Sequence, residues 1–306
     1  MKSVNKFAIY TACIGGYDNI LQPEVIDERF DYFLFTNDVK EESVGVWQVR
    51  KVAYSNPDMT RIARYVKTHP DELLPEYEAT LWMDANIQIV SSEIYERFID
   101  LLHTDIDVAS ICHPYRDCIY DEAFEVSYSK KYGRLEHDLI AINWCHHIYN
   151  EHYPIHNGLF ETNILFRKNK ELVNKANDLW WKSIDIYSKR DQLSCNYVLW
   201  KYNLAIDYIL PKGEHAQSSD KVRYISHGKI SRRKLVQADF GEQWRYKTAN
   251  LSSWTLKVWQ KAWQKAYISN HPISNLKLYG ILLGVLYSPF LLFRVIKHRL
   301  IKLVNR

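Results

Sequence analysis

The stretch "LWMDANIQIV", residues 81–90, places two oxygen-bearing side chains in the middle of an apolar run. Asp84 and Asn86 stand two residues apart, so on a strand their side chains would face the same way. Burying a carboxylate is costly unless a cation meets it. Two oxygen ligands at a strand end would seat a hard divalent cation. The alternative is that Asp84 caps a helix or pairs with an arginine.

Three basic side chains precede this stretch at three-residue steps, namely Arg61, Arg64 and Lys67 in "RIARYVK". On a helix they would share one face. Such a face is commonly solvated. Beside a metal site, however, it could neutralise a diphosphate, because Arg forks and Lys point charges both bind phosphate oxygens.

Ionisable residues also gather in "HPYRDCIYDEA", residues 113–123. His113 follows an apolar run, and Arg116, Asp117 and Glu122 come soon after it. Charged groups packed at a strand end indicate recognition of substrate hydroxyls or acid–base catalysis. A structural ion pair between Arg116 and Glu122 is the competing interpretation.

A histidine-rich segment runs from His137 to His156 and contains "CHH" at 145–147. Its spacings match no standard zinc site, and Pro154 interrupts the pair His152 and His156. We therefore expect no zinc site from these spacings.

The elements that must position these side chains alternate between strand-like and helix-like runs. Apolar, β-branched or aromatic runs predict strands at 7–14, 31–36, 79–90, 106–112, 161–167, 204–210 and 222–226. Helical spacing and caps predict helices within 57–74, 91–103, 169–189 and 190–202. This alternation predicts an α/β fold with a mainly parallel sheet flanked by helices. In such sheets ligands bind beyond the carboxyl ends of the strands.

Seven sequence blocks occur in a specific order over roughly residues 7–230: "YTACIGGYDNI", "RIARYVKTHP", "LWMDANIQI", "HPYRDCIYDEA", "NGLFETNILFR", "WW" and "RDQLSCNYVLW". With them the chain resembles the glycosyltransferase-like domain family of plant mucilage-related and turgor-regulation proteins and of bacterial polysaccharide loci. That family is similar in turn to GT-A-fold transferases and, distantly, to family 8 glycosyltransferases. Their nucleotide-sugar site uses a D-x-D strand end and a divalent metal.

The resemblance implies a role for each candidate residue. The metal, manganese or magnesium, would be held by Asp84, Asn86 and His227, although Asn86 departs from the second aspartate of the family pattern. Donor-binding residues would be Tyr10, Thr11, Gly15, Gly16, Arg61, Arg64, Lys67, Gln192 and Lys229. Acceptor or sugar contacts would come from His113, Arg116, Glu161 and Thr162. The catalytic carboxylates would be Asp191 and Glu122, with helix capping as the alternative role of Asp191, because it opens a predicted helix.

Composition divides the chain into an acidic body and a basic tail. The net charge is +4, yet residues 251–306 hold nine Lys or Arg and neither Asp nor Glu. That tail also carries tryptophans in "WTLKVWQKAWQKAY" and an uncharged run, 278–293, which is shorter than the roughly 20 residues of a spanning helix. The pattern predicts interfacial binding to anionic lipid, not nucleic acid. A C-terminal pair of core helices is the alternative.

These observations predict a catalytic domain over residues 1–245 and a membrane-associating segment over 251–306. Five cysteines without C-x-x-C spacing and an N-terminus without a secretory signal favour a reducing compartment. We expect a cytoplasmic protein, peripheral on the inner face of the cell membrane. The leading hypothesis is a transferase that moves a sugar from a nucleotide-sugar donor to a glycan or lipid-linked acceptor. The alternatives are a metal-dependent hydrolase at the membrane surface and a non-catalytic module that binds nucleotide or glycan.

Overall fold

The computed structural model of the protein describes residues 6–128, 141, 144–145 and 147–226. The chain divides into two compact units, residues 1–122 with 153–244, and residues 123–152 with 245–306. The first unit holds the β-sheet and all of the described candidate site residues. The predicted boundary between residues 245 and 251 lies outside the described part of the chain.

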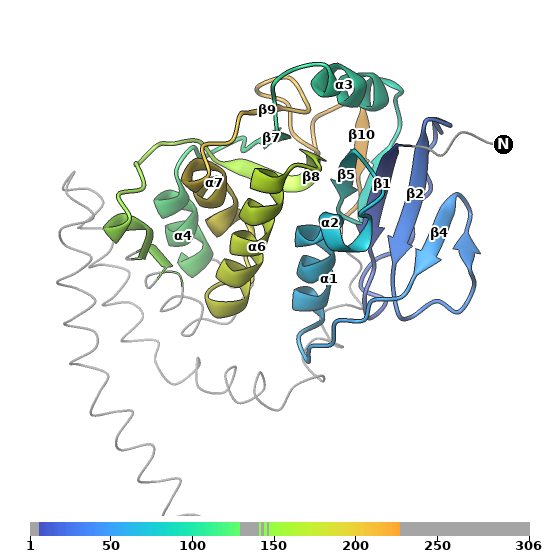
Figure 1. Ribbon diagram of the computed structural model, residues 1–306, viewed down its shortest axis with the longest axis horizontal. Helices are drawn as coiled ribbons and strands as arrows, with labels where there is room; N and C mark the ends of the chain where they lie inside the picture. Colours follow the sequence, from blue (N-terminus) through green and yellow to red (C-terminus); the bar gives the residue numbers. More distant parts are fainter. Residues whose placement is uncertain (1–5, 129–140, 142–143, 146, 227–306) are drawn as a thin grey trace, which may run out of the picture. The chain divides into compact units, whose positions relative to one another are not determined.

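An eight-stranded sheet organises the first unit, in the order β3-β4-β2-β1-β5-β8-β7-β9 (Figure 1). Its strands are β1 (Phe7–Ala12), β2 (Phe30–Phe35), β3 (Ser43–Val44), β4 (Trp47–Arg50), β5 (Ala79–Met83), β7 (Val108–Cys112), β8 (Phe160–Lys168) and β9 (Ile206–Tyr208). Four of the seven neighbouring pairs are parallel, and β8 runs antiparallel to both of its neighbours. A separate ribbon pairs β6 (Ile87–Ile89) with β10 (Val222–Tyr224). The predicted mixed α/β fold with a mainly parallel sheet is confirmed.

Helices cover both faces of this sheet. The described helices are α1 (Met59–Thr68), α2 (Pro70–Leu73), α3 (Glu93–Leu102), α4 (Ile119–Tyr128), α6 (Glu171–Ile186) and α7 (Gln192–Lys201). On one face α1 contacts β1, α7 contacts β8, and α6 packs between α1 and α7 (Figure 1). On the other face the Phe98 ring of α3 packs on Phe30 and Phe166, with centroids 4.9 and 4.8 Å apart. Apolar side chains therefore fill both layers.

The alternation of side chains along β1 assigns its residues to the two layers. Ile9 points into the core that contains α3, whereas Tyr10 packs edge-on against Trp82 and Phe35 with centroids 5.2 and 6.2 Å apart. The Tyr10 hydroxyl donates a hydrogen bond to the carbonyl of Lys67 on α1, at 3.0 Å. Strand β1 is thus buried on both faces, as central parallel strands are.

Two predicted elements are interrupted in the structure. The run 79–90 is not one strand, because the chain turns after Met83 and the Ile87 amide donates to the Asp84 carbonyl at 2.9 Å. The predicted helix in 57–74 divides into α1 and α2 at His69, because Pro70 disfavours helical geometry in the residue before it. Strands β3 and β4 were not predicted, since their short, polar runs carry little periodic signal.

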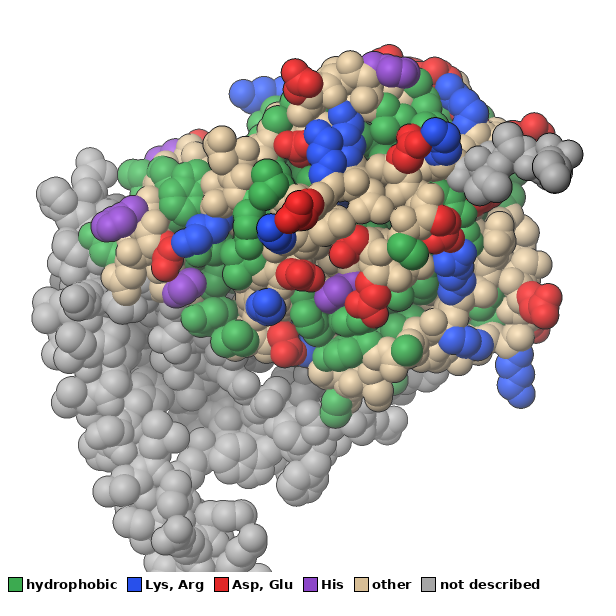
Figure 2. Space-filling model, viewed as in Figure 1, with side chains coloured by type: hydrophobic (Ala, Val, Ile, Leu, Met, Phe, Trp, Pro, Cys, Tyr) green, Lys and Arg blue, Asp and Glu red, His purple; other side chains and the backbone are tan. Residues whose placement is uncertain are grey.

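Charged side chains of both signs are interspersed on the face of the molecule drawn in Figure 2. Exposed pairs such as Lys175 with Glu171, 2.6 Å apart, are screened by water and contribute little to stability. The ion pairs that matter for the site are the buried ones.

Among the described residues, none of the helices has the length and apolar character needed to cross a membrane.

Candidate functional site

The end of β5 meets the C-terminal half of α1 and the start of α7, and a buried carboxylate lies between them. Asp191 is 2% exposed and its Oδ2 accepts hydrogen bonds from Lys67 Nζ at 2.5 Å and from Thr162 Oγ1 at 2.8 Å. The Arg64 guanidinium lies 3.3 Å from Oδ1. We call Asp191, Lys67, Arg64 and Thr162 the Asp191 cluster.

The charges of the Asp191 cluster hold its carboxylate ionised. Burial by itself would raise the pKa of Asp191, but Arg64, Lys67 and the Thr162 hydroxyl outweigh it and hold the pKa well below its usual range. Lys67 is 0% exposed, so its ammonium depends on this carboxylate for compensation. In the structure Lys67 pairs with the carboxylates of Asp191 and Asp84, and its predicted contact with a donor phosphate stays a prediction.

Asp84 lies at the solvent side of the same cations. It follows the last residue of β5, and its backbone amide donates to the Asn163 carbonyl on β8 at 2.8 Å. Its Oδ1 accepts from Trp82 Nε1 at 2.8 Å and lies 3.4 Å from Lys67 Nζ and 3.8 Å from Arg64. These contacts all fall on Oδ1, and the side chain is 28% exposed. Oδ2 is therefore the oxygen that this set of contacts leaves for a ligand, and the predicted pairing with an arginine is present as well.

A second buried carboxylate belongs to Glu122 at the start of α4. It is 1% exposed. Its Oε2 accepts from Arg116 Nε at 2.8 Å, and its Oε1 accepts from Arg190 at 2.8 and 3.0 Å. His113 Nε2 lies 3.8 Å from Oε2. We call Glu122, Arg116, Arg190 and His113 the Glu122 cluster, and it contains the Arg116–Glu122 ion pair that the sequence left as an alternative.

His113 is held neutral inside the Glu122 cluster. Its Nδ1 accepts hydrogen bonds from the backbone amides of Tyr115 and Arg116 at 3.2 and 3.1 Å. Burial lowers the pKa of His113 to about 4, and Arg116 and Arg190 oppose its protonation while Glu122 favours it. The two guanidinium groups thus satisfy Glu122, and His113 orders the loop before α4.

Consecutive residues at the start of α7 connect the two clusters. Arg190 binds Glu122, and Asp191 binds Lys67 and Arg64. Asp191 stands at the N-cap position of α7, but its side chain accepts no capping hydrogen bond. Helix capping is therefore not its role in the structure, because the carboxylate is turned to the cations of α1.

Glu161 is the site carboxylate whose negative charge is least balanced by cationic side chains. It lies on β8, one residue before Thr162, and its buried Oε2 has no hydrogen-bond partner among the described residues. Burial raises the pKa of Glu161, His215 and hydrogen bonds lower it, and the nearby Asp84 raises it. A carboxylate with a spare oxygen and a raised pKa has the properties of a proton acceptor.

A small pocket opens beside Asp84, at the carboxyl ends of β1, β2 and β5. Its walls include Thr11, Cys13, Leu34, Trp47 and Asp84. Thr11 Oγ1 is buried there and has no hydrogen-bond partner in the described part of the chain. Thr11 and Asp84 are therefore the polar side chains that this pocket offers to a ligand.

The turn after β1 requires its glycines. Gly15 and Gly16 have φ values of +72° and +60°, a region that disfavours side chains. A Cβ at Gly15 would lie 2.1 Å from Met59 Sδ. The predicted turn is present, and it brings the chain back over the pocket side of β1.

The structure corrects the predicted orientation of two donor-site residues. Tyr10 is 0% exposed and faces α1, because it has the opposite strand parity from Thr11. Arg61 donates to the carbonyls of Ile184 and Asp185 at the end of α6. Steps of three residues drift around a helix of 3.6 residues per turn, so Arg61 does not share the direction of Lys67.

Gln192 is a further predicted donor-site residue. It is buried, and its Nε2 donates to the carbonyl of Phe160 at 3.2 Å, which holds the start of β8 against α7. One N–H of its amide is therefore engaged by the backbone, and the predicted hydrogen bond to a donor sugar stays a prediction.

Asn86 also differs from its predicted orientation. It lies in the turn between β5 and β6, is 5% exposed, and its Nδ2 donates to the Ile225 carbonyl at 3.0 Å. The expectation that it shares a strand face with Asp84 is wrong, because the strand ends at Met83. His227 and Lys229, the remaining predicted metal and donor residues, lie outside the described residues.

Sequence reasoning missed three residues of this region, namely Trp47, Arg190 and His215. Arg190 directly precedes Asp191 in the "RDQ" block, so its place in that block could have identified it as a site residue. Trp47 belongs to a strand that was not predicted, and His215 stands in a loop whose proximity to Glu161 is set only by the tertiary fold.

Comparison with known proteins assigns the chain to a family. The sequence pattern of the TOD1/MUCI70 glycosyltransferase-like domain matches residues 1–212, more than half of the chain. The chain belongs to this family. The resemblance stated from the seven sequence blocks is thereby confirmed.

Two curated members of the TOD1/MUCI70 family from Arabidopsis thaliana are similar in sequence. One is named "Alkaline ceramidase TOD1" and is 23% identical over 189 residues, 58% of this chain and 39% of the relative. The other is named "Probable hexosyltransferase MUCI70" and is 22% identical over 228 residues, 65% of this chain and 38% of the relative. The matched region thus spans about two fifths of each curated relative.

A solved structure, titled as the apo structure of the WbbM bifunctional glycosyltransferase, is similar with a TM-score of 0.41 and 12% sequence identity. The similarity covers 81% of this chain and 52% of that chain.

Proposed function

We propose that the protein transfers a sugar from a nucleotide-sugar donor to a glycan or lipid-linked acceptor. Membership of a glycosyltransferase-like family and the name of the hexosyltransferase relative support glycosyl transfer in general. The observation that carries the proposal is Asp84 at the end of β5, whose partly exposed carboxylate lies beside Arg64 and Lys67. In α/β sheets this strand end is where ligands bind.

In this proposal the donor lies with its nucleotide toward the pocket and its diphosphate toward Asp84 and Arg64. Thr11 supplies a hydroxyl and Trp47 an apolar wall to the nucleotide. Arg64, 19% exposed, is the cation of the Asp191 cluster closest to solvent, whereas Lys67 is fully buried. Arg64 therefore contacts phosphate oxygens, and Lys67 fixes in place the two aspartates that hold Arg64.

A divalent cation, manganese or magnesium, fits this site in part. Asp84 offers Oδ2, whereas Asn86 is buried and its Nδ2 is bonded to the Ile225 carbonyl, so its Oδ1 is the only side-chain atom that could ligate a metal. A bound cation would neutralise charge that develops on the departing diphosphate. In the absence of a cation, Arg64 and Lys67 would supply the positive charge beside the departing diphosphate.

Glu161 is the group that we assign to removal of the acceptor proton. The two carboxylates first predicted as catalytic, Asp191 and Glu122, are each buried and bonded to two cationic side chains. Among the described residues, Glu161 Oε2, on the same strand as Thr162, has no hydrogen-bond partner. Asp191 and Glu122 then act as positioning residues for α1, α4 and α7.

The test is a screen of nucleotide sugars by thermal shift, with manganese and with a chelator, followed by turnover of the stabilising donor. With manganese present, we expect Asp84→Asn to weaken donor binding roughly ten- to a hundredfold, because Asp84 would hold the cation that attracts the diphosphate and a contact with a charged group contributes about 1.5–3 kcal/mol. The fold should remain intact, because Asp191 still compensates Lys67 and Arg64. Isothermal titration of the same donor into both proteins measures the difference.

Equal donor affinity for the wild type and Asp84→Asn would place the donor elsewhere. Hydrolysis of ceramide without binding of any nucleotide sugar would favour the activity named for the ceramidase relative. Binding without turnover would identify a non-catalytic module.

We also propose that the protein works at the inner face of the cell membrane, through residues 251–306. The support is compositional, since this segment lies outside the described residues. Replacing Lys257, Lys261 and Lys265 with glutamate should weaken binding to phosphatidylserine vesicles by about a hundredfold or more, at about 1 kcal/mol for each basic residue lost. Flotation of the full chain with anionic and with zwitterionic vesicles measures the effect, and indifference to vesicle charge would contradict it.

A further inference from the structure

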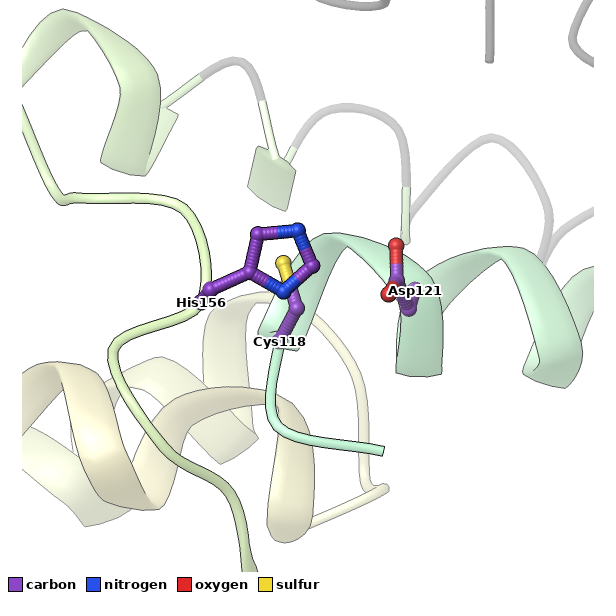
Figure 3. Close-up of side chains that lie close together, drawn as sticks. All are labelled: Cys118, Asp121 and His156. Atoms are coloured by element: carbon purple, nitrogen blue, oxygen red, sulfur yellow. The ribbon is translucent and has the colours of Figure 1, made fainter. Parts of the chain in front are cut away.

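Three side chains with metal-binding chemistry meet away from Asp84, at the beginning of α4. Cys118 immediately precedes the helix, Asp121 lies in its first turn, and His156 comes from the segment before β8 (Figure 3). One ligand atom from each, a sulfur, an oxygen and a nitrogen, lies within 4.8 Å of the other two. Sequence spacing did not reveal this set, because Cys118 and His156 are far apart in the chain.

The set matches the ligands that a borderline-soft cation prefers. Zn²⁺ binds thiolate, imidazole and carboxylate at about 2.0–2.3 Å in tetrahedral geometry, which places ligand atoms roughly 3.3–3.8 Å apart. The separations, all within 4.8 Å, exceed these by about 1.5 Å at most, a difference that side-chain rotation closes. Cys118 is buried while His156 is exposed, so the exposed imidazole can move without disturbing the core.

The orientation of His156 supports binding through its second nitrogen. Its Nδ1 lies 2.7 Å from Asp117 Oδ1. In the tautomer that donates from Nδ1 to this carboxylate, Nε2 carries the lone pair that a metal binds, as in carboxylate–histidine–zinc arrangements. His156 also has a positive φ of 52°, a backbone conformation that side chains disfavour.

We propose that Cys118, Asp121 and His156 form a site for Zn²⁺, with Asp117 as the carboxylate that orients His156. The site is separate from the proposed donor site. Three protein ligands leave a fourth position for water. The metal would tie the start of α4, which carries Glu122, to the segment that leads into β8, which carries Glu161. Burial raises the pKa of the Cys118 thiol, so the metal displaces its proton on binding.

The experiment titrates the metal-free, full-length protein with Zn²⁺ alone and, separately, with Co²⁺ as a spectroscopic substitute. We expect His156→Ala to bind one Zn²⁺ fewer than the wild type and to lose the rise in melting temperature that Zn²⁺ produces. Cys118→Ser should lose the thiolate-to-cobalt charge-transfer absorption. Asp117→Asn should weaken Zn²⁺ binding by about tenfold or more, because it removes only the orienting contact.

The exposed position of His156 keeps this test independent of folding, and circular dichroism of each metal-free variant confirms that it is folded. Asp84→Asn is the matched control for the proposed donor-site metal and should retain the cobalt absorption at full intensity. The proposal is overturned if His156→Ala binds as much Zn²⁺ as the wild type. It is equally overturned if Co²⁺ gives no thiolate absorption with the wild-type protein.

Discussion

The Asp191→Ala variant is expected to lose about 3–5 kcal/mol of folding free energy, the usual cost of removing one partner from a buried ion pair. The substitution leaves the Lys67 ammonium fully buried with Asp84 as its remaining carboxylate, 3.4 Å away. It also removes the acceptor of the Thr162 hydroxyl. For a domain of this size we expect the melting temperature to fall by about 6–20 °C.

Chemical denaturation of the wild type, Asp191→Ala and the double variant Lys67→Met/Asp191→Leu measures this cost. The double variant should recover a large part of the loss, because a buried ion pair can be replaced by apolar side chains with little penalty. An Asp191→Ala protein of unchanged stability that has lost turnover would instead return Asp191 to a catalytic role.

The same carboxylate gives stability a defined pH dependence. The folded pKa of Asp191 lies below its unfolded value, which is about 3.9. Its contribution is therefore fully present above that unfolded value and is lost as the pH falls toward the folded pKa. Acid unfolding of the wild type should show this loss below about pH 4, and Asp191→Asn should lack that component.

Local patterns were sufficient to predict most strands and the place of Asp84, because apolar runs and helix caps act within a few residues. Local patterns failed to predict which side of the sheet a side chain faces, because a shift of one residue along a strand reverses that side. Tyr10 and Thr11 are neighbours, yet strand alternation buries the first under α1 and turns the second to the pocket. Asn86 was misassigned for a related reason, since a turn replaced the assumed strand.

Contacts between distant segments were beyond the reach of the sequence. The pairs Lys67 with Asp191 and Arg190 with Glu122 depend on how α1, α4 and α7 are packed around the sheet. The sequence therefore predicted Lys67, Asp191 and Glu122 as candidate site residues without showing which charged side chains they pair with. Glu161 was predicted only as an acceptor or sugar contact, because the lack of a hydrogen-bond partner for its Oε2 within the described part of the chain is a property of the folded interior.

Glu161→Gln is expected to lower turnover by about 10²–10⁴-fold, the usual contribution of a general base. Glutamine keeps the shape of the side chain and cannot accept the acceptor proton. Donor affinity should change little, since the nucleotide is held by the pocket containing Thr11 and by Asp84 and Arg64. Single-turnover rates and donor titrations with each protein separate the two quantities.

The pH dependence distinguishes a proton acceptor from a residue that only shapes the site. Burial raises the pKa of Glu161 above its ordinary value of 4.5, so wild-type turnover should fall as the pH drops through that raised pKa. The residual turnover of Glu161→Gln should lack this limb. Unchanged turnover in Glu161→Gln, or an identical acid limb in both proteins, would remove Glu161 from the chemistry.

Stability should move in the opposite direction from Asp191→Ala. A carboxylate whose folded pKa is raised makes the folded state less stable as the pH rises through that value. Glu161→Gln removes this buried charge and should leave the melting temperature at neutral pH unchanged or higher. A substitution that costs turnover while preserving or improving stability is the behaviour expected of a group retained for chemistry, and it would separate Glu161 from the fully compensated Asp191.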